Sequence, residues 1–227
     1  VGERCYLNHD ELLLRYCGTL LLSHKYRSGL GVQPFHFDRA FSFLCTVIAG
    51  NTMRHEDRMM TTATIGLIGA GRMGLAQIKH LIRGGYQVAV CERDETNQTK
   101  AMALGAYLVD TPEACFDAAE IVYVAVGFDP EVEAVCRGPH GLMSSARQGG
   151  VVVVNSTCDP EFMQEMAAAF ETKGHGFLDV PIARGGWAAD NGTLLAMVGG
   201  DQAALERVRP SLSTFCSDIE WMGGVGT

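Results

Sequence analysis

Three glycines at a fixed spacing are the residues of this chain whose pattern most clearly implies chemistry. In a turn that leads from a strand into a helix, the first glycine makes the tight turn, the second lets the backbone approach a pyrophosphate, and the third lets the helix pack closely on the sheet. The N–H groups at the helix start then point at the phosphates, with the positive end of the helix dipole behind them. We call this segment the glycine fingerprint and predict that its six residues contribute to cofactor binding: Gly69, Ala70, Gly71, Arg72, Met73 and Gly74.

The surrounding sequence has to support this interpretation, because three spaced glycines are a weak signal in a chain that holds 27 of them in 227 residues. Residues 72–83 place apolar side chains near one helical face, and two glycines then stop the helix. A second apolar run over 87–91 ends at Glu92, 18 residues after Gly74, where a carboxylate can accept hydrogen bonds from an adenosine ribose. The alternative interpretation is a glycine-rich turn of an α/β protein that binds no ligand.

From Thr64 onward, strand-like and helix-like segments alternate with short connections. This alternation predicts an α/β fold of the Rossmann type, in which a doubly wound, largely parallel sheet is covered by helices on both faces. Strands are expected at 64–69, 87–92, 106–109, 120–126, 150–155, 176–180, 193–199 and 217–222. Helices are expected at 72–83, 95–104, 112–118, 130–136, 160–173 and 201–214.

Residues 1–60 do not continue the alternation, so we divide the chain into an irregular N-terminal extension of unassigned fold over 1–60 and a Rossmann NAD(P)-binding domain over 61–227. A partner-binding or targeting segment is one interpretation of the extension. A segment without a selected fold is the other.

The bulk composition argues against several classes of partner and site. A net charge of −8 disfavours nucleic acid and anionic membranes as partners. No uncharged apolar stretch reaches the ~18 residues of a membrane span, and no secretory signal is recognised. The eight cysteines are scattered, without C-x-x-C pairs or companion histidines, so we expect reduced thiols in a cytoplasmic protein and no metal site.

The chain from about Thr64 to Thr227 resembles the cofactor-binding domain of the β-hydroxyacid dehydrogenases. That group includes 3-hydroxyisobutyrate dehydrogenase and tartronate semialdehyde reductase, and the cofactor domain of 6-phosphogluconate dehydrogenase is related to it. Four ordered matches are more specific than the fingerprint alone. They are the fingerprint itself, 129–133 running to 138–142, 156–160, and 179–182 running to 192–194 and 199–201.

The resemblance implies an NAD(P)-dependent oxidoreductase that transfers a hydride between nicotinamide and a small hydroxy acid or its semialdehyde. Val126 and Gly127, together with Ser156 and Thr157, are then expected beside the nicotinamide half of the cofactor. Thr157 is the best candidate for the junction with the substrate, because its hydroxyl can both donate and accept. Its alternative role is to cap the helix that begins near residue 160.

One matched stretch departs from the family at positions where relatives usually carry Ser-Gly-Gly and hold the substrate. This chain has Ala183, Arg184 and Gly185 there. The missing hydroxyl removes one neutral hydrogen bond, whereas Arg184 can bind a carboxylate through two charge-assisted bonds. We therefore expect these three residues and Thr157 to bind an acidic substrate, the alternative being a solvent-facing arginine without a ligand.

The resemblance also places the family's catalytic lysine, a general acid/base, about five residues beyond Thr227. The helical C-terminal domain of the family is expected to be missing as well. We therefore interpret the chain as a fragment that has no catalytic residue of its own and turns over little or nothing. The full-length protein is expected to be a homo-oligomer. Two other functions stay open: a non-catalytic dinucleotide-binding or oligomerisation module, and an imine reductase-like enzyme.

Glu92, Arg93 and Asp94 bear on the choice of cofactor. Relatives that use NADP tend to carry Asn-Arg-Thr at these positions, so Arg93 favours NADP and Glu92 disfavours it. Two like charges ~4 Å apart repel by ~1 kcal/mol in water and by ~4 kcal/mol at an effective dielectric constant of ~20. A 2′-phosphate beside Glu92 would meet a repulsion between these limits. We expect Glu92 and Arg93 to bind the cofactor and favour NAD, with NADP as the alternative.

Overall fold

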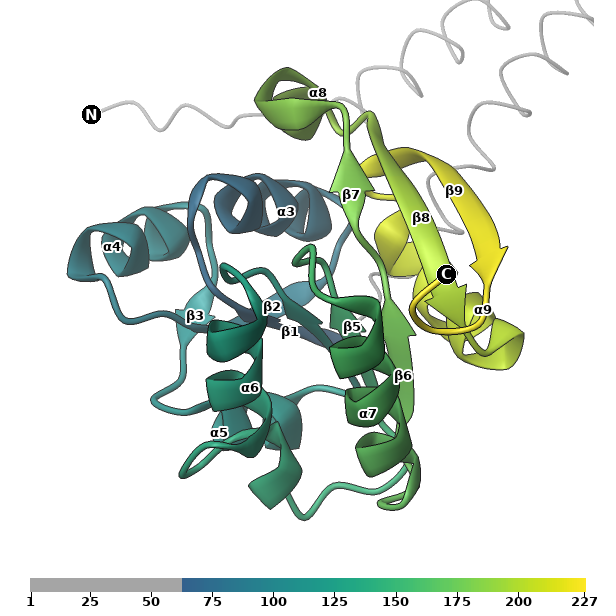
Figure 1. The fold of residues 1–227 in the computed structure, drawn as a ribbon. Coiled ribbons are helices and arrows are strands. Elements are labelled where there is room, and N and C mark those ends of the chain that lie inside the picture. Colours follow the sequence, from purple (N-terminus) through teal and green to yellow (C-terminus); the bar gives the residue numbers. More distant parts are fainter. Residues whose placement is uncertain (1–62) are drawn as a thin grey trace, which may run out of the picture. The chain divides into compact units, whose positions relative to one another are not determined.

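Nine strands form one sheet with helices on both faces in the part of the chain that the structure, a computed structural model, describes, residues 63–227 (Figure 1). The strands are β1 (Thr64–Ile68), β2 (Gln87–Cys91), β3 (Tyr107–Leu108), β4 (Ile121–Val124), β5 (Val151–Val154), β6 (Gly176–Asp179), β7 (Ile182–Ala183), β8 (Leu194–Gly200) and β9 (Cys216–Gly223). The helices are α3 (Arg72–Arg83), α4 (Glu95–Ala103), α5 (Pro112–Ala118), α6 (Asp129–Arg137), α7 (Pro160–Glu171), α8 (Gly185–Asn191) and α9 (Gln202–Leu212), with a 3-10 turn at Leu142–Ser144.

The sheet is doubly wound, as the sequence predicts. Its strand order is β3-β2-β1-β4-β5-β6-β8-β7, and β9 pairs with β8. Strands β1 to β6 run parallel to one another, whereas β8 is antiparallel to both β6 and β7. The chain builds outward from β1 in one direction and then returns to build from β4 in the other. The carboxyl ends of β1 and β4 therefore flank the topological switch point, where ligands of such sheets bind.

Two hydrophobic clusters cover the two faces of the sheet. Successive side chains of a strand point to opposite faces, and Val151 and Val153 of β5 accordingly lie in one cluster while Val152 and Val154 lie in the other. Helices α3, α4, α8 and α9 contribute to the first cluster, and α5, α6 and α7 contribute to the second. Both faces of β5 are fully buried, which explains its unbroken valine sequence.

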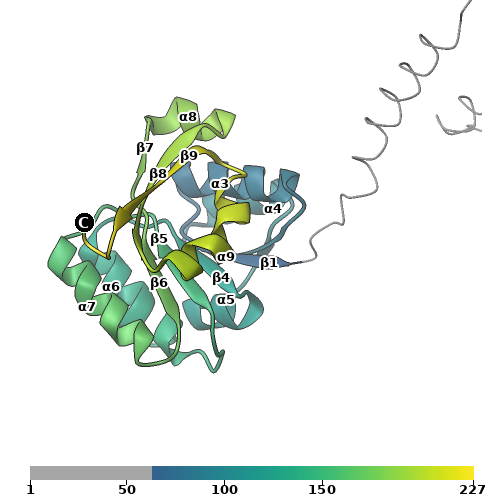
Figure 2. The same ribbon diagram turned by 90° about the vertical axis from the view of Figure 1, so that its right-hand side faces the viewer.

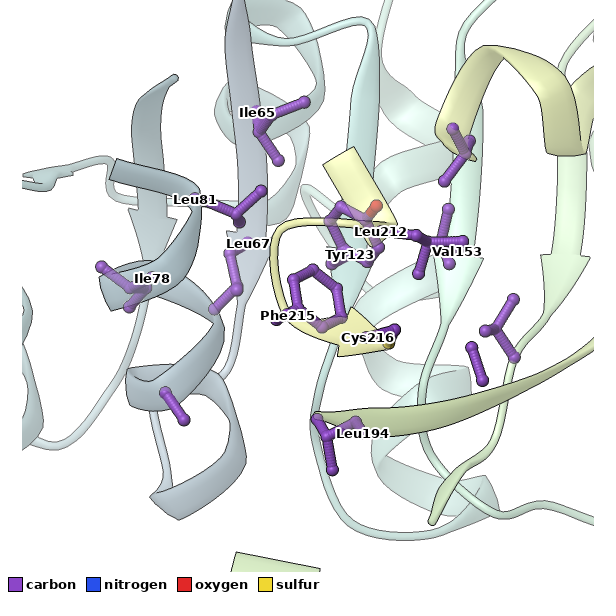
Figure 3. Packing of buried hydrophobic residues seen from close by; sticks show 14 of the residues in the cluster. Ile65, Leu67, Ile78, Leu81, Tyr123, Val153, Leu194, Leu212, Phe215 and Cys216 are labelled. Atoms are coloured by element: carbon purple, nitrogen blue, oxygen red, sulfur yellow. The ribbon is translucent and has the colours of Figure 1, made fainter. Parts of the chain in front are cut away.

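The first cluster contains an aromatic contact beneath α9 (Figure 3). The rings of Tyr123 and Phe215 meet edge to face with centroids 5.5 Å apart. The buried Tyr123 hydroxyl and the Oγ of Ser211 are 2.6 Å apart and hydrogen-bonded, so the polar end of the tyrosine is paired within the core.

Side-chain caps start four of the helices. Asp94, Thr111, Asp159 and Asp201 each accept a hydrogen bond from a backbone N–H in the first turn of α4, α5, α7 and α9 respectively. Such a cap typically contributes ~0.5–2 kcal/mol. Helix α5, capped by Thr111, has the bounds expected from the sequence, and so does α3, which begins after Gly71 without a side-chain cap.

Strand β7 and helix α8 are absent from the sequence-based expectation. Helix α8 begins with Gly185 and Gly186, which disfavour a helix interior. Left-handed residues at both of its ends, Arg184 at φ +83° and Gly192 at φ +68°, confine it to seven residues. Figure 2 shows α8 beyond the ends of β7 and β8, outside the parallel part of the sheet.

The predicted extension over 1–60 lies outside the described residues, so its fold and the proposed boundary near residue 60 stay predictions. Within residues 63–227, no helix is long and apolar enough to cross a membrane. The same residues hold no cluster of side chains suited to a metal ion. Their five cysteines, at positions 91, 115, 136, 158 and 216, are free.

A buried histidine should make the stability of this domain depend on pH. His175 packs against Phe116, with ring centroids 4.9 Å apart, and no described group bonds to its Nδ1. Burial, with Lys173 and Arg147 nearby, lowers the pKa of His175 below its ordinary value of 6.5. The unfolded state then binds the proton more readily, so this stability is present above pH 6.5 and is lost as the pH falls from there toward the folded pKa.

We expect the urea midpoint to fall between about pH 7.5 and pH 5, and to fall less in His175→Leu. Denaturation monitored by circular dichroism checks this. Some decline should remain in the variant, because burial also lowers the pKa of His80. An equal decline in the variant and the parent protein would contradict the assignment to His175.

Candidate dinucleotide-binding cleft

A cleft of about 960 Å³ lies at the carboxyl ends of β1, β2, β4 and β5. The residues that end or follow these strands form its floor, among them Ile68, Glu92, Val126 and Asn155. The cleft therefore spans the switch point of the sheet, from the β2 side to the β5 side. Nine of the eleven residues predicted to bind the cofactor line it: Gly69, Gly71, Arg72, Met73, Glu92, Arg93, Val126, Gly127 and Thr157.

The three fingerprint glycines occupy three different environments. Gly69 has φ +91°, and a Cβ there would lie 2.4 Å from the carbonyl oxygen of Ala125. A Cβ on Gly74 would lie 2.0 Å from the carbonyl oxygen of Gly69. At Gly71, in contrast, a Cβ would meet no atom within 4 Å. Two glycines are therefore required by backbone packing, and the middle one leaves open space over the start of α3, which fits a pyrophosphate.

Glu92 closes the β2 end of the fingerprint loop. Its Oε2 accepts a hydrogen bond from the N–H of Ala70 at 2.5 Å. Its Oε1 accepts from the N–H groups of Arg93 and Asp94 at 2.7 and 2.9 Å. The carboxylate is thus fixed at the place predicted for the adenosine ribose, while Ala70 contributes its N–H to this contact and is itself buried.

The two arginines of the predicted site differ in their contacts. Arg72, the first residue of α3, pairs with Asp190 of α8 at 2.6 Å, and both side chains are more than half exposed. An ion pair this exposed contributes little stability, typically ~0–1 kcal/mol, so its guanidinium can change partners at low cost. Arg93 is exposed at the edge of the cleft beside Glu92.

Hydrogen bonds fix the β4 and β5 side of the cleft. The Ser156 hydroxyl donates to the carbonyl oxygen of Val126 at 2.9 Å and so joins the loops that follow β4 and β5. Thr157, next in the chain, is exposed and lines the cleft. The N–H of Phe128 donates to Oε2 of Glu131 at 2.6 Å, and a Cβ on Gly127 would collide with the same carboxylate. Val126, Gly127 and Thr157 therefore lie together on one wall.

Some residues of the cleft are missing from the sequence-based site. Asn97, Phe128, Glu131 and Asn155 line it as well. Asn155 could have been found from the sequence, because it directly follows a strand whose neighbours carry the site. The other three depend on how α4 and α6 tilt over the cleft, which local sequence does not report.

The predicted substrate residues 183–185 are not among the residues that line the cleft, although the preceding Ile182 is. The Arg184 guanidinium pairs with Asp218 of β9 at 2.6 Å. It also donates to the Ser217 hydroxyl and the Thr193 carbonyl oxygen, at 3.0 and 3.2 Å. Arg184 is therefore an exposed side chain with partners on β9 and at Thr193, and its role toward a substrate stays a prediction. No lysine of the described residues lines the cleft.

The cysteine beside Thr157 is not an activated nucleophile. Burial, together with Asp129 and Asp179, raises the pKa of the Cys158 thiol to about 12. A thiol with such a pKa stays protonated at neutral pH, whereas the thiolate is the reactive form. Cys158 is therefore expected to pack rather than react.

A family model described as the NAD binding domain of 6-phosphogluconate dehydrogenase matches residues 64–223. The chain belongs to this family. The match runs from β1 to the end of β9 and so contains the whole cleft. It identifies these residues as an NAD(P)-binding domain and confirms the resemblance found in four stretches of the sequence.

Curated relatives carry oxidoreductase names. The probable 3-hydroxyisobutyrate dehydrogenase-like 1 of Arabidopsis thaliana is 32% identical over 185 residues, which are 81% of this chain and 55% of the relative. The 2-hydroxy-3-oxopropionate reductase of Escherichia coli is 33% identical over 162 residues, 71% of this chain and 55% of the relative. The chain thus spans about half the length of the curated relatives it matches.

Solved structures give the same fold and both forms of the cofactor. The 3-hydroxyisobutyrate dehydrogenase of Mycobacterium tuberculosis with L-serine has a TM-score of 0.69 at 26% identity, covering 73% of this chain and 56% of that one. Psf3 in complex with NADP+ and 2-OPP has a TM-score of 0.69 at 29% identity, covering 72% and 58%. A variant imine reductase from Myxococcus stipitatus in complex with NAD+ has a TM-score of 0.67 at 25% identity, covering 72% and 56%.

The contrast between Gly71 and Gly74 gives a matched pair of variants. Gly71→Val adds atoms to open space, so the thermal midpoint should change little while the dissociation constant of NADH rises at least about tenfold. Gly74→Ala forces α3 away from Gly69 and should cost about 1–3 kcal/mol of stability. Thermal melts and NADH fluorescence titrations distinguish the two. Unchanged NADH binding by a folded Gly71→Val would show that the pyrophosphate does not lie over Gly71.

Proposed function

We propose that this chain is the cofactor-binding part of an NAD-dependent oxidoreductase of the 3-hydroxyacid dehydrogenase type. The observation that carries the proposal is the open space over Gly71 at the switch point of the sheet, where Gly69 and Gly74 are closed by backbone packing. Names of the relatives support the substrate class, since they include a probable 3-hydroxyisobutyrate dehydrogenase and a 2-hydroxy-3-oxopropionate reductase. The matched region is 55% of each of these relatives, so we propose the activity for a protein that also contains the rest of their length.

The direct test is a titration of the 227-residue chain with NADH, followed by its fluorescence. We expect saturable binding below millimolar concentration. A chain that binds no NADH at one millimolar would contradict the proposal.

Bound nicotinamide supplies the hydride acceptor or donor. The residues of this chain bind and orient the cofactor. The N–H groups of the first turn of α3 would face the phosphates, and Glu92 would accept from a ribose hydroxyl. Thr157 presents a hydroxyl that can donate or accept at the nicotinamide side. We propose that the family's lysine, which moves the proton of the substrate oxygen, lies beyond Thr227.

Two other candidate functions, an imine reductase and a non-catalytic module, can be distinguished from the dehydrogenase by the substrates that the protein turns over. The similarity to a Myxococcus stipitatus imine reductase favours an imine substrate as the second candidate. Consumption of NADH with a semialdehyde but not with a cyclic imine, in a form of the protein that turns over, supports the dehydrogenase. Binding of NADH without turnover of either substrate in the full-length protein supports a non-catalytic module.

The fixed carboxylate of Glu92 supports NAD over NADP. Three backbone N–H groups hold it at the β2 end of the cleft, so it cannot easily move away from a 2′-phosphate. Arg93 can recover part of the repulsion by pairing with the phosphate or stacking on adenine. Since similar structures hold either NADP+ or NAD+, the preference has to come from residues such as these.

We expect the parent chain to bind NADH about tenfold more tightly than NADPH, within the range set by like charges ~4 Å apart. Glu92→Gln keeps the size of the side chain and removes its charge, so it should cut this preference to about twofold or less. Asp94→Asn is the matched control, because it removes a charge two residues from Glu92 while an asparagine can still cap α4. Fluorescence titrations with both cofactors measure the ratio. Tighter NADPH binding by the parent chain would reverse our assignment.

We also propose that the segment Ala183–Gly185 binds an acidic substrate together with Thr157. Arg184 can reach a carboxylate only by leaving Asp218. Arg184→Ala should therefore raise the substrate KM at least about tenfold, and Asp218→Asn should lower it, in a form of the protein that turns over. If both variants change only the thermal midpoint, Arg184 joins β9 to the rest of the sheet and does not bind substrate.

The assembly of the full-length protein as a homo-oligomer and a cytoplasmic location stay predictions. The five free cysteines of the described residues are consistent with a reducing compartment.

A further inference from the structure

A pair of buried amide side chains connects α3 to the end of β5 behind the cleft. Nε2 of Gln77 donates to Oδ1 of Asn155 at 3.2 Å. Nδ2 of Asn155 donates to the carbonyl oxygen of Val180 at 2.9 Å. Gln77 has no exposed surface and Asn155 has 7%. Of the two, Asn155 lines the cleft and Gln77 does not.

The carbonyl oxygen of Val180 determines which atom donates and which accepts in both of these hydrogen bonds. A backbone carbonyl can only accept, so Asn155 must turn its Nδ2 toward Val180 and its Oδ1 toward Gln77. Gln77 must then donate through Nε2, which leaves its Oε1 facing the interior. No described group donates to this oxygen.

An unpaired buried carbonyl oxygen is unfavourable, because it has lost its hydrogen bonds to water without replacement. Methionine has about the same length, would fill the same position, and contains no such oxygen. Burial of the glutamine is therefore only partly compensated, because its Nε2 is paired and its Oε1 is not. The hydrogen bond to Asn155 is the one described contact that the Gln77 amide makes outside α3. Because Asn155 lines the cleft, this bond points to a role of Gln77 in shaping the cleft.

The contacts of Asn155 show which parts of the sheet its side chain connects to α3. Its N–H donates to the carbonyl oxygen of Val124, and the N–H of Val180 donates to that of Val154, both at 2.8 Å. The Asn155 side chain thus joins the ends of two neighbouring strands to α3, the helix that begins at the fingerprint. The next residues along the chain are Ser156, bonded to Val126, and Thr157, which lines the cleft.

We infer that Gln77 and Asn155 are positioning residues that fix the turn 155–157 relative to α3 and thereby shape the half of the cleft that receives nicotinamide. The inference rests on the proposed function. Adenosine binds on the β2 side of the switch point, so the pair acts on the nicotinamide half alone. Loss of the pair should weaken ligands that contain nicotinamide and spare those that lack it.

The test compares NADH with ADP-ribose, which keeps the adenosine and both phosphates but lacks nicotinamide, by calorimetric titration of the 227-residue chain. In Gln77→Met we expect the dissociation constant of NADH to rise about three- to tenfold, as for one lost hydrogen bond. That of ADP-ribose should stay within about twofold. The thermal midpoint should change little, because the substitution removes the unpaired Gln77 oxygen but leaves Oδ1 of Asn155 without its donor. A purely structural role would not change the ratio of the two affinities.

Gln98→Met is the matched control. Gln98 is a partly buried glutamine on α4 whose Nε2 donates to the carbonyl oxygen of Glu92 at 2.7 Å, on the adenosine side. Any effect there should be equal for NADH and ADP-ribose. Asn155→Ser provides the same measurement if Gln77→Met does not fold, and the double variant should weaken NADH less than the product of the two single effects.

The possible outcomes distinguish failure of the positioning role from failure of the proposed function. If the parent chain binds NADH and Gln77→Met leaves the ratio of affinities unchanged, the positioning role is wrong and the proposed function stands. If the parent chain binds neither ligand, both are wrong.

Discussion

The site depends on the direct contact of backbone with backbone at the start of α3. Because Gly74 has no side chain, the first turn of the helix lies against the carbonyl of Gly69, and Gly69 in turn lies against the carbonyl of Ala125. The helix, the end of β1 and the end of β4 are thereby joined without any intervening side chain. This contact brings the N–H groups of α3 to the switch point, and it leaves Gly71 facing the cleft. The loops that follow β2, β4 and β5 line the cleft around this start of α3.

Two carboxylates at the cleft, those of Glu92 and Glu131, accept hydrogen bonds from the backbone of its loops. Glu92 accepts from three N–H groups on the β2 side, and Glu131 accepts from the N–H of Phe128 on the β4 side. Each carboxylate holds a loop in shape and also places a negative charge where a dinucleotide would present hydroxyls. The positive end of α3 lies between them, which suits a pyrophosphate. This arrangement supports the proposed binding of a dinucleotide in the cleft.

The sequence predicts the parts of this arrangement that depend on short-range rules. Helix α3 has the bounds 72–83 expected from its apolar spacing and its glycine stop, α7 begins at the expected residue 160, and α9 begins one residue after the expected start. Glu92 lies at the cleft because a parallel strand must end there. The contacts of Arg184 could not be predicted in this way. Its partner Asp218 is 34 residues away on β9, and the left-handed turn that directs the side chain there is unusual for an arginine.

Other long-range contacts join α8, the helix that follows the predicted substrate residues, to the helix α3 that begins at the fingerprint. Nζ of Lys79 donates to the carbonyl oxygen of Asp190 at 2.6 Å, and Nε2 of His80 lies 3.0 Å from that of Ala189. Arg72 pairs with Asp190 from the first turn of α3. Helix α3 thus contacts α8 from its first residue and again about two turns later, while the Gln77 side chain of that helix reaches the end of β5. A tilt of α3 would move the fingerprint, the turn 155–157 and α8 together. Helix α3 therefore carries contacts to the fingerprint loop, to the end of β5 and to α8, which makes it the common element of the proposed cofactor and substrate sites.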